Sequence, residues 1–270
     1  MKSLFNGFLA LSLFASVTFA HADPSAIIKA VAPSIVTVKV TQKTTVGADG
    51  QSSNEESTSD SEGVIITPDG IVMISTLSYD SSMLETMILG NLPDGMKMKN
   101  IPEGFRVIEG RDVHEYPAKL VAMDSQYGLT FVKIEAPAGT VFPAISMDQP
   151  TATTIGENVF TVSRLNAGYG YAPFCTQDTI GGMVTQPSLA YILGTSSTNL
   201  GLPYFDTNGK LLGVLTMLKP LIAPNIKDMS MISASSLFKP FLVPTTSLKA
   251  VIQQAIAKAS AATTTAPATK

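Results

Sequence analysis

Few side chains in this sequence are candidates for a nucleophile and a general base that act together. Ser196 and Ser197 are candidate nucleophiles, because a serine activated by a neighbouring base carries out acyl transfer. His21 lies in the apolar N-terminal segment, so His114 is the candidate base in the rest of the chain. No motif relates His114 to the two serines, and a surface histidine is the simpler interpretation. A Ser–Lys pair needs no histidine, but the nearest downstream lysine, Lys210, follows a hairpin turn.

No segment has the spacing of a metal or cofactor site. Acidic residues gather within residues 44–62, but without the spacing of a calcium-binding loop. No Cys/His pattern predicts zinc, and the Gly-Tyr-Gly-Tyr segment 168–171 lacks the strand-to-helix context of a phosphate loop. Cys175 is the one cysteine, which excludes an internal disulfide. We interpret it as a buried small residue, with pairing to another chain as the alternative. We therefore expect no metal and no cofactor.

Composition and the N-terminus narrow the cellular context. Charged residues are 14% of the chain and the net charge is −3, without a basic stripe, so we expect no nucleic-acid partner. Residues 1–22 predict a signal peptide, because Lys2 precedes an apolar run and Ala20-His21-Ala22 has the small-x-small form of a cleavage site. The run is short and interrupted for a membrane anchor, which is the alternative. We expect an exported protein, periplasmic or secreted, with no stable membrane span after signal cleavage.

The elements that would position a site are mostly short strands. Segments such as 35–40, 64–66, 71–74, 129–134, 159–162 and 211–215 are β-branched or alternate, and two hairpin signals, Pro68-Asp69-Gly70 and Asp206-Thr207-Asn208-Gly209, lie among them. Their regular spacing predicts an all-β barrel or sandwich. Residues 24–32 and 246–259 predict helices, the second with Ser247 as its N-cap and an apolar stripe. We expect a mobile loop over residues 44–62, a crossing between two halves near 137–150, and a disordered tail over 260–270.

The order of these segments resembles the HtrA/Deg-type branch of the trypsin-like serine proteases, without a PDZ domain. The resemblance is carried in turn by residues 32–38, 62–72, 116–134, 155–159 with 182–185, 203–214, and 241–244 with the following helix. It implies two six-stranded β-barrels of the trypsin-like (chymotrypsin) fold with a cleft between them, plus a C-terminal helix. The N-terminal barrel would span residues 23–140, and the C-terminal barrel with its closing helix residues 141–259.

The resemblance also implies that the catalytic triad is degenerate. Leu77 stands at the position of the family's His, Gly128 at its Asp, and Leu200 at its nucleophilic Ser. Thr198 replaces a glycine whose N–H helps to form the oxyanion hole, and a β-branched residue resists the backbone angles of such a loop. We expect no catalytic residue at these positions, and we expect Leu77 and Leu200 to pack together and seal the site.

The resemblance places further residues near the old cleft. Candidate cleft-lining residues are Thr198, Asn199, Gly201, Tyr169 and Tyr171. Residues 83–108 form a Met-bearing insertion, which we interpret as a packed flap or a partner-binding element.

Three functions remain open. The leading hypothesis is a pseudoenzyme that binds an extended peptide or a protein partner, for example by strand addition. The alternatives are a residual serine endopeptidase that uses the displaced Ser196 or Ser197, and a structural subunit of an active protease. The sequence does not predict the oligomeric state.

Overall fold

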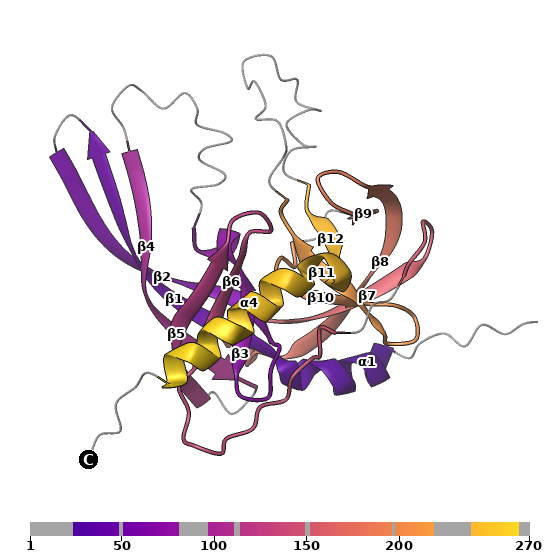
Figure 1. The fold of residues 1–270 in the computed structure, drawn as a ribbon, viewed down its shortest axis with the longest axis horizontal. Coiled ribbons are helices and arrows are strands. Elements are labelled where there is room, and N and C mark those ends of the chain that lie inside the picture. The colour runs from indigo at the N-terminus through magenta and orange to yellow at the C-terminus, as the bar shows by residue number, and fades with distance from the viewer. Residues whose placement is uncertain are drawn as a thin grey trace, which may run out of the picture.

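The computed structural model describes residues 24–48, 51–80, 97–110, 114–148, 152–195, 198–218 and 239–264. The predicted signal peptide, residues 83–96 of the predicted insertion, and both Ser196 and Ser197 lie outside these ranges. Two β-barrels lie side by side, with one long helix across the front of both (Figure 1).

The first barrel is closed by six antiparallel strands in the cyclic order β1-β2-β3-β6-β5-β4. The strands are β1 (Ile35–Ala48), β2 (Gln51–Ile65), β3 (Ile71–Ser75), β4 (Lys97–Glu109), β5 (His114–Asp124) and β6 (Leu129–Ile134). The predicted turn at residues 68–70 joins β2 to β3, and Gly70 adopts a φ of 90°, which a glycine permits at no steric cost. Alternate residues of β1 (Val36, Val38 and Val40) are fully buried inside this barrel.

The second barrel repeats the topology of the first. Its cyclic order, β7-β8-β9-β12-β11-β10, matches β1-β2-β3-β6-β5-β4 strand for strand. The strands are β7 (Asn158–Arg164), β8 (Pro173–Val184), β9 (Ala190–Leu193), β10 (Pro203–Phe205), β11 (Leu211–Thr216) and β12 (Phe241–Pro244). Two closed six-stranded antiparallel barrels form a chymotrypsin-like double barrel, which confirms the predicted fold class.

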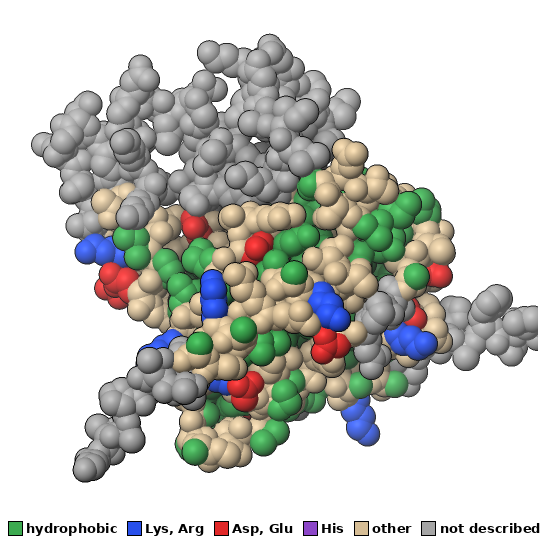
Figure 2. All heavy atoms as spheres, viewed as in Figure 1, with side chains coloured by type: hydrophobic (Ala, Val, Ile, Leu, Met, Phe, Trp, Pro, Cys, Tyr) green, Lys and Arg blue, Asp and Glu red, His purple; other side chains and the backbone are tan. Residues whose placement is uncertain are grey.

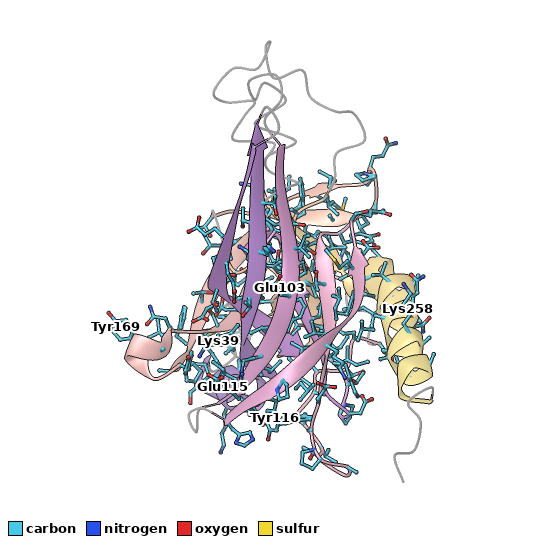
Figure 3. The ribbon with its side chains drawn as sticks, turned by 90° about the vertical axis from the view of Figure 1, so that its left-hand side faces the viewer. Lys39, Glu103, Glu115, Tyr116, Tyr169 and Lys258 are labelled. Atoms are coloured by element: carbon cyan, nitrogen blue, oxygen red, sulfur yellow. The ribbon has the colours of Figure 1, made fainter. Side chains whose placement is uncertain are left out.

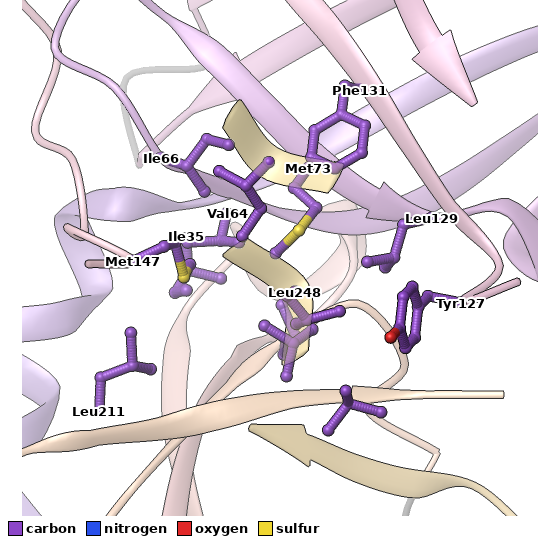
Figure 4. Packing of buried hydrophobic residues seen from close by; sticks show 14 of the residues in the cluster. Ile35, Val64, Ile66, Met73, Tyr127, Leu129, Phe131, Met147, Leu211 and Leu248 are labelled. Atoms are coloured by element: carbon purple, nitrogen blue, oxygen red, sulfur yellow. The ribbon is translucent and has the colours of Figure 1, made fainter. Parts of the chain in front are cut away.

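A single apolar core joins the two barrels. Buried residues of the first barrel, such as Val64, Met73 and Leu129, belong to the same cluster as Val162 and Val214 of the second. Figure 4 shows part of this cluster, with Leu248 of the C-terminal helix beside the first-barrel side chains. Because close-packed interiors deform little, the core fixes the position of one barrel against the other.

Helix α4 (Thr245–Thr264) covers the seam between the barrels, as Figure 1 shows. Its buried residues Leu248, Ile252, Ala255 and Ala259 lie on one helix face, and the first three belong to the predicted apolar stripe. The helix begins at Thr245, so Ser247 lies within its first turn and is not the N-cap. The helix continues to Thr264, so residues 260–264 are helical rather than part of the expected tail. A shorter helix, α1 (Pro24–Val31), buries Ile27 and Val31 in the same cluster.

Residues 44–48 and 51–62 lie in strands, which corrects the expectation of a loop over 44–62. β1 and β2 pair without interruption from Ile35↔Val64 to Ala48↔Gln51, and β4 pairs with β1 as far as Gly47↔Lys97. Residues 97–108 of the predicted insertion are therefore barrel strand β4 rather than a flap. The outer parts of the three strands extend beyond the barrel as a ribbon, seen at the left of Figure 1 and upright in Figure 3. We call residues 41–48, 51–61 and 97–104 the arm.

The connection between the barrels runs from residue 135 to 157. It stays with the first barrel beyond the predicted boundary at residue 140, because the N–H groups of Phe142 and Ile145 donate to Pro68 O (2.8 Å) and Ile65 O (2.9 Å). On the face that carries α4, charged side chains lie scattered among neutral and apolar ones (Figure 2). Within the described ranges no helix combines the length and apolar character needed to cross a membrane.

Candidate functional site

The positions of the degenerate triad are brought together by the ends of strands. Leu77 lies in the short 3₁₀ helix η2 (Thr76–Ser78) that follows β3, and Gly128 ends the turn between β5 and β6. The pairing Ser75↔Leu129 sets these two segments side by side, and the Thr76 N–H donates to Gly128 O at 2.8 Å. Gly128 has a φ of 59°, a left-handed conformation that disfavours residues with a Cβ.

The turn that carries Leu200 reaches the same place from the second barrel. Gly201 has a φ of 84°, and its N–H donates to Leu215 O at 2.7 Å. A Cβ on Gly201 would lie 2.6 Å from Ser75 N, so the turn rests directly on the backbone at the end of β3. The segments that carry Leu77 and Leu200 therefore lie side by side where the barrels touch.

The end of β11 completes this junction. The Thr216 hydroxyl donates to Tyr127 O, and a Cβ on Gly128 would lie 3.5 Å from Met217 O. We call residues 75–77, 127–128, 200–202 and 215–217 the barrel junction. It unites all three positions that the resemblance assigned to the triad.

The side chains at the three positions have no acid–base or nucleophilic group. Leu200 is half-buried and packs against the interior cluster of the second barrel, with residues such as Tyr204 and Leu215. Leu77 is also half-buried, and its contact with Leu200 stays a prediction. Acyl transfer needs a nucleophile with a base in hydrogen-bond reach, and these residue types supply neither.

The backbone N–H groups of the turn are already engaged. Those of Leu200, Gly201 and Leu202 donate to Thr198 O (2.8 Å), Leu215 O (2.7 Å) and Asn199 O (3.3 Å). An oxyanion hole requires donors directed at the developing charge. In this conformation these three donors point into the chain itself.

Hydroxyl groups line the first-barrel side of the junction. Thr130, fully buried, bonds both Thr76 Oγ1 (2.8 Å) and the Tyr79 hydroxyl (2.7 Å), and burial raises the pKa of Tyr79. Ser75 is 1% exposed, and its Oγ has no hydrogen-bond partner among the described residues. A hydroxyl without a neighbouring base is a weak nucleophile, so this network is structural.

His114 lies far from the junction along the chain of the first barrel. It begins β5 and pairs with Glu109, whereas Gly128 lies just beyond the other end of β5. At about 3.3 Å per residue, the two ends of this strand are on the order of 30 Å apart. The imidazole packs against Tyr116 with 4.4 Å between ring centroids. His114 is therefore out of reach as a base for the junction.

The candidate cleft-lining residues divide into two groups. Gly201 belongs to the junction, and Thr198 and Asn199 precede it in the chain. Thr198 is exposed, whereas Asn199 is half-buried and its side-chain amide donates to Thr176 Oγ1 at 3.2 Å. Tyr169, in η3 (Ala167–Tyr169), is 69% exposed at the tip of a protruding turn (Figure 3). Tyr171 is 4% exposed, so it has almost no surface to offer a partner, which corrects its assignment as a cleft residue.

A polar clamp between the barrels was missed by the sequence reasoning. The Arg164 guanidinium, at the end of β7, donates to Ile35 O (2.5 Å), Ala32 O (2.5 Å) and Tyr171 O (3.0 Å). Glu62 of β2 accepts hydrogen bonds from the Ser163 hydroxyl (2.5 Å) and the Arg164 N–H (2.7 Å). For Arg164 the available signal was a charged residue at the end of the apolar and β-branched strand β7, whereas Glu62 stands among polar and acidic residues of β2 and gave no such signal. The clamp holds the barrels together on the side of α1.

A hollow lies away from the junction. It has a volume of about 460 Å³ and lies between α4, the β2–β3 turn and the inter-barrel connection, with Ile66, Met147, Lys249 and Ile252 among its lining residues. Across the described ranges no three His, Cys, Asp or Glu side chains are grouped to hold a metal ion. No protein-family model matches the chain, and no curated protein is significantly similar to it.

Proposed function

We propose that this chain is a catalytically inactive relative of the HtrA/Deg-type trypsin-like proteases, and that it acts as a peptide- or protein-binding module. The carrying observation is the barrel junction, where Leu77, Gly128 and Leu200 come together from both barrels. The convergence of these positions in a double barrel supports the family resemblance. Their residue types, together with the inward-directed N–H groups of residues 200–202, support the loss of acyl-transfer chemistry.

Binding is the function that such a scaffold retains. Two closed barrels on one core provide a rigid frame, and the arm extends paired strands beyond it. An exposed strand can bind an extended chain through its backbone without any catalytic group. We also propose, from the N-terminal segment, that the protein is exported to the periplasm or secreted.

Fluorescence anisotropy of labelled, unfolded casein, followed for hours after addition of the purified protein, tests this function. We expect a rise that saturates with protein concentration and then holds, because the peptide is bound and not cut. A steady fall below the starting value would mean cleavage and would overturn the proposal. A flat trace over the whole titration would also count against peptide binding.

The falling trace has a matched control. If cleavage occurs, Ser196→Ala and Ser197→Ala variants show whether a displaced serine is responsible, since either substitution removes one hydroxyl. Activity that persists in the double variant, which lacks both hydroxyls, would exclude the two serines as its source. Activity that does not scale with the concentration of the purified protein would come from a contaminating protease and would leave the proposal standing.

A further inference from the structure

Strand β2 presents an unpaired edge along the arm. Within the described ranges it pairs with β1 from residue 51 to 64, but with β3 only from Gly63 to Ile65. Residues 51–62 therefore have ladder partners on one side. At about 3.3 Å per residue this edge is roughly 40 Å long, enough for a peptide of about a dozen residues. Figure 1 shows it on the outer side of the arm, away from the barrels.

The two edges of the arm differ in how they resist further pairing. On the other edge, β4 carries Pro102, which has no N–H, and a register shift against Thr41 and Gln42 that leaves Glu103 as an extra residue. Proline and bulges are devices by which natural sheets prevent edge-to-edge association. Between residues 51 and 62, β2 has no proline, and its pairing with β1 has no register shift. Among the strands that the structure describes, the β2 edge of the arm is therefore the one without a device against further pairing.

The side chains along this edge are acidic. Glu55, Glu56 and Asp60 are exposed, and residues 51–62 include no Lys or Arg. Two lysines of β1 lie opposite these carboxylates in the register, Lys43 opposite Glu56 and Lys39 opposite Asp60. None of the three carboxylates forms an ion pair with any described residue, and Lys39 lies 2.6 Å from Glu115 instead. The edge therefore repels a second copy of itself and other acidic strands.

We propose that the β2 edge of the arm, residues 55–61, binds an extended basic peptide segment by strand addition. The unpaired backbone groups of β2 would supply the hydrogen bonds, and the acidic side chains would select Lys and Arg at alternate positions of the peptide. This inference rests on the proposed binding function and names its site and the class of its partner. It is distinct from the barrel junction.

Two labelled twelve-residue peptides test the selectivity, one alternating Lys and Thr and one alternating Glu and Thr. We expect the basic peptide to bind at least about tenfold more tightly than the acidic one at 50 mM salt, and the difference to shrink at 500 mM because exposed charges are screened. Equal binding of both peptides would refute charge selection at this edge.

A matched pair of double variants tests the location. Glu55→Lys with Glu56→Lys reverses two charges on β2, and Glu103→Lys with Glu109→Lys makes the same charge change on β4. We expect the β2 variant to lose the preference for the basic peptide and the β4 variant to keep it. Equal weakening in both would show a general charge effect and overturn the assigned edge.

Hydrogen exchange separates failure of the site from failure of the function. Bound basic peptide should slow exchange in the fragment that covers residues 51–62 and leave the fragment of 97–109 unchanged. Slower exchange elsewhere in the protein, but not in residues 51–62, would refute the β2 site and leave the proposed peptide binding intact. If neither the basic peptide nor unfolded casein binds, both the β2 site and the proposed binding function are refuted. Protection of β2 that grows with protein concentration alone would assign the edge to a second copy instead.

Discussion

Substitution of Gly201 by Ala tests how tightly the turn that carries Leu200 rests on the first barrel. The substitution adds one Cβ, which would lie 2.6 Å from Ser75 N, a backbone atom that cannot rotate away. A left-handed conformation costs a residue with a Cβ about 1–2 kcal/mol, and forcing an atom into a packed interior adds about 1–3 kcal/mol. We therefore expect Gly201→Ala to lower the free energy of unfolding by about 2–5 kcal/mol.

Gly209 provides the matched control. Its φ of 75° is close to the 84° of Gly201, but a Cβ there would meet no atom within 4 Å. Gly209→Ala should therefore cost only the backbone term of about 1–2 kcal/mol. Urea unfolding followed by circular dichroism measures both variants, and equal slopes would show that the midpoints report stability. Equal losses in the two variants would refute the contact between the turn and the end of β3, and with it the geometry of the junction.

Four further predictions test the clamp, the junction and the titrating groups. Arg164→Met should lower the free energy of unfolding by at least about 3 kcal/mol, because three buried carbonyls lose a charged donor. Thermal unfolding measures this loss of stability, and a loss below about 1 kcal/mol would contradict the clamp. Ser75→Ala should leave the free energy of unfolding unchanged or raise it by up to about 1 kcal/mol, since the buried Oγ of Ser75 has no hydrogen-bond partner among the described residues. A clear decrease of this free energy in the same urea assay would mean that the hydroxyl is hydrogen-bonded. The hydrogen bond from Lys39 to Glu115 lowers the pKa of Glu115 and raises the pKa of Lys39. The pair's contribution to the free energy of unfolding, less than about 1 kcal/mol, is therefore fully present between about pH 4.3 and 10.4, and it is lost as the pH falls through the folded Glu115 pKa or rises through the folded Lys39 pKa. Glu115→Gln should flatten the pH–stability curve at both ends, and an unchanged curve would count against the pair. Burial raises the pKa of the half-buried Cys175 thiol, so Ellman's reagent should react with it more slowly at pH 8 than with the unfolded chain, and equal rates would disprove its shielding.

The double barrel was predictable because local and global signals agree in most of its strands. Hairpins are indicated by β-branched segments that flank turn residues, as at 68–70 and 206–209. The order of these hairpins along the chain then indicates which strands close each barrel. Helix α4 was predictable for the same reason, since its apolar stripe has the helical period and packs on the seam.

The arm was not predictable from hydrophobic patterning. Residues 44–62 are polar apart from Val46, Ala48 and two glycines, so they show no alternation of apolar and polar residues, which is the signal of a half-buried strand. What stabilises these strands is pairing across β1, for instance the hydrogen bond from Thr44 Oγ1 to Asn100 Oδ1 at 2.8 Å, between residues far apart in the sequence. Composition typical of a loop therefore concealed a sheet.

The sequence predicted which segments would lie at the barrel junction, whereas the role of Leu77, Gly128 and Leu200 as degenerate triad positions stays a prediction. The motif order located Leu77, Gly128 and Leu200, and the structure brings their segments together. Burial of Tyr171 and the clamp at Arg164 depend on how the second barrel docks on α1 and β1, which no local pattern in the sequence encodes.

Mass spectrometry of unfolded casein after prolonged incubation with the purified protein tests the central claim most directly. The absence of a nucleophile and base at the barrel junction predicts no new peptide termini above those of a protein-free incubation. The account would be contradicted by new termini that increase with protein concentration and disappear when Ser196 or Ser197 is replaced by Ala. That result would show that the protein is an active serine endopeptidase.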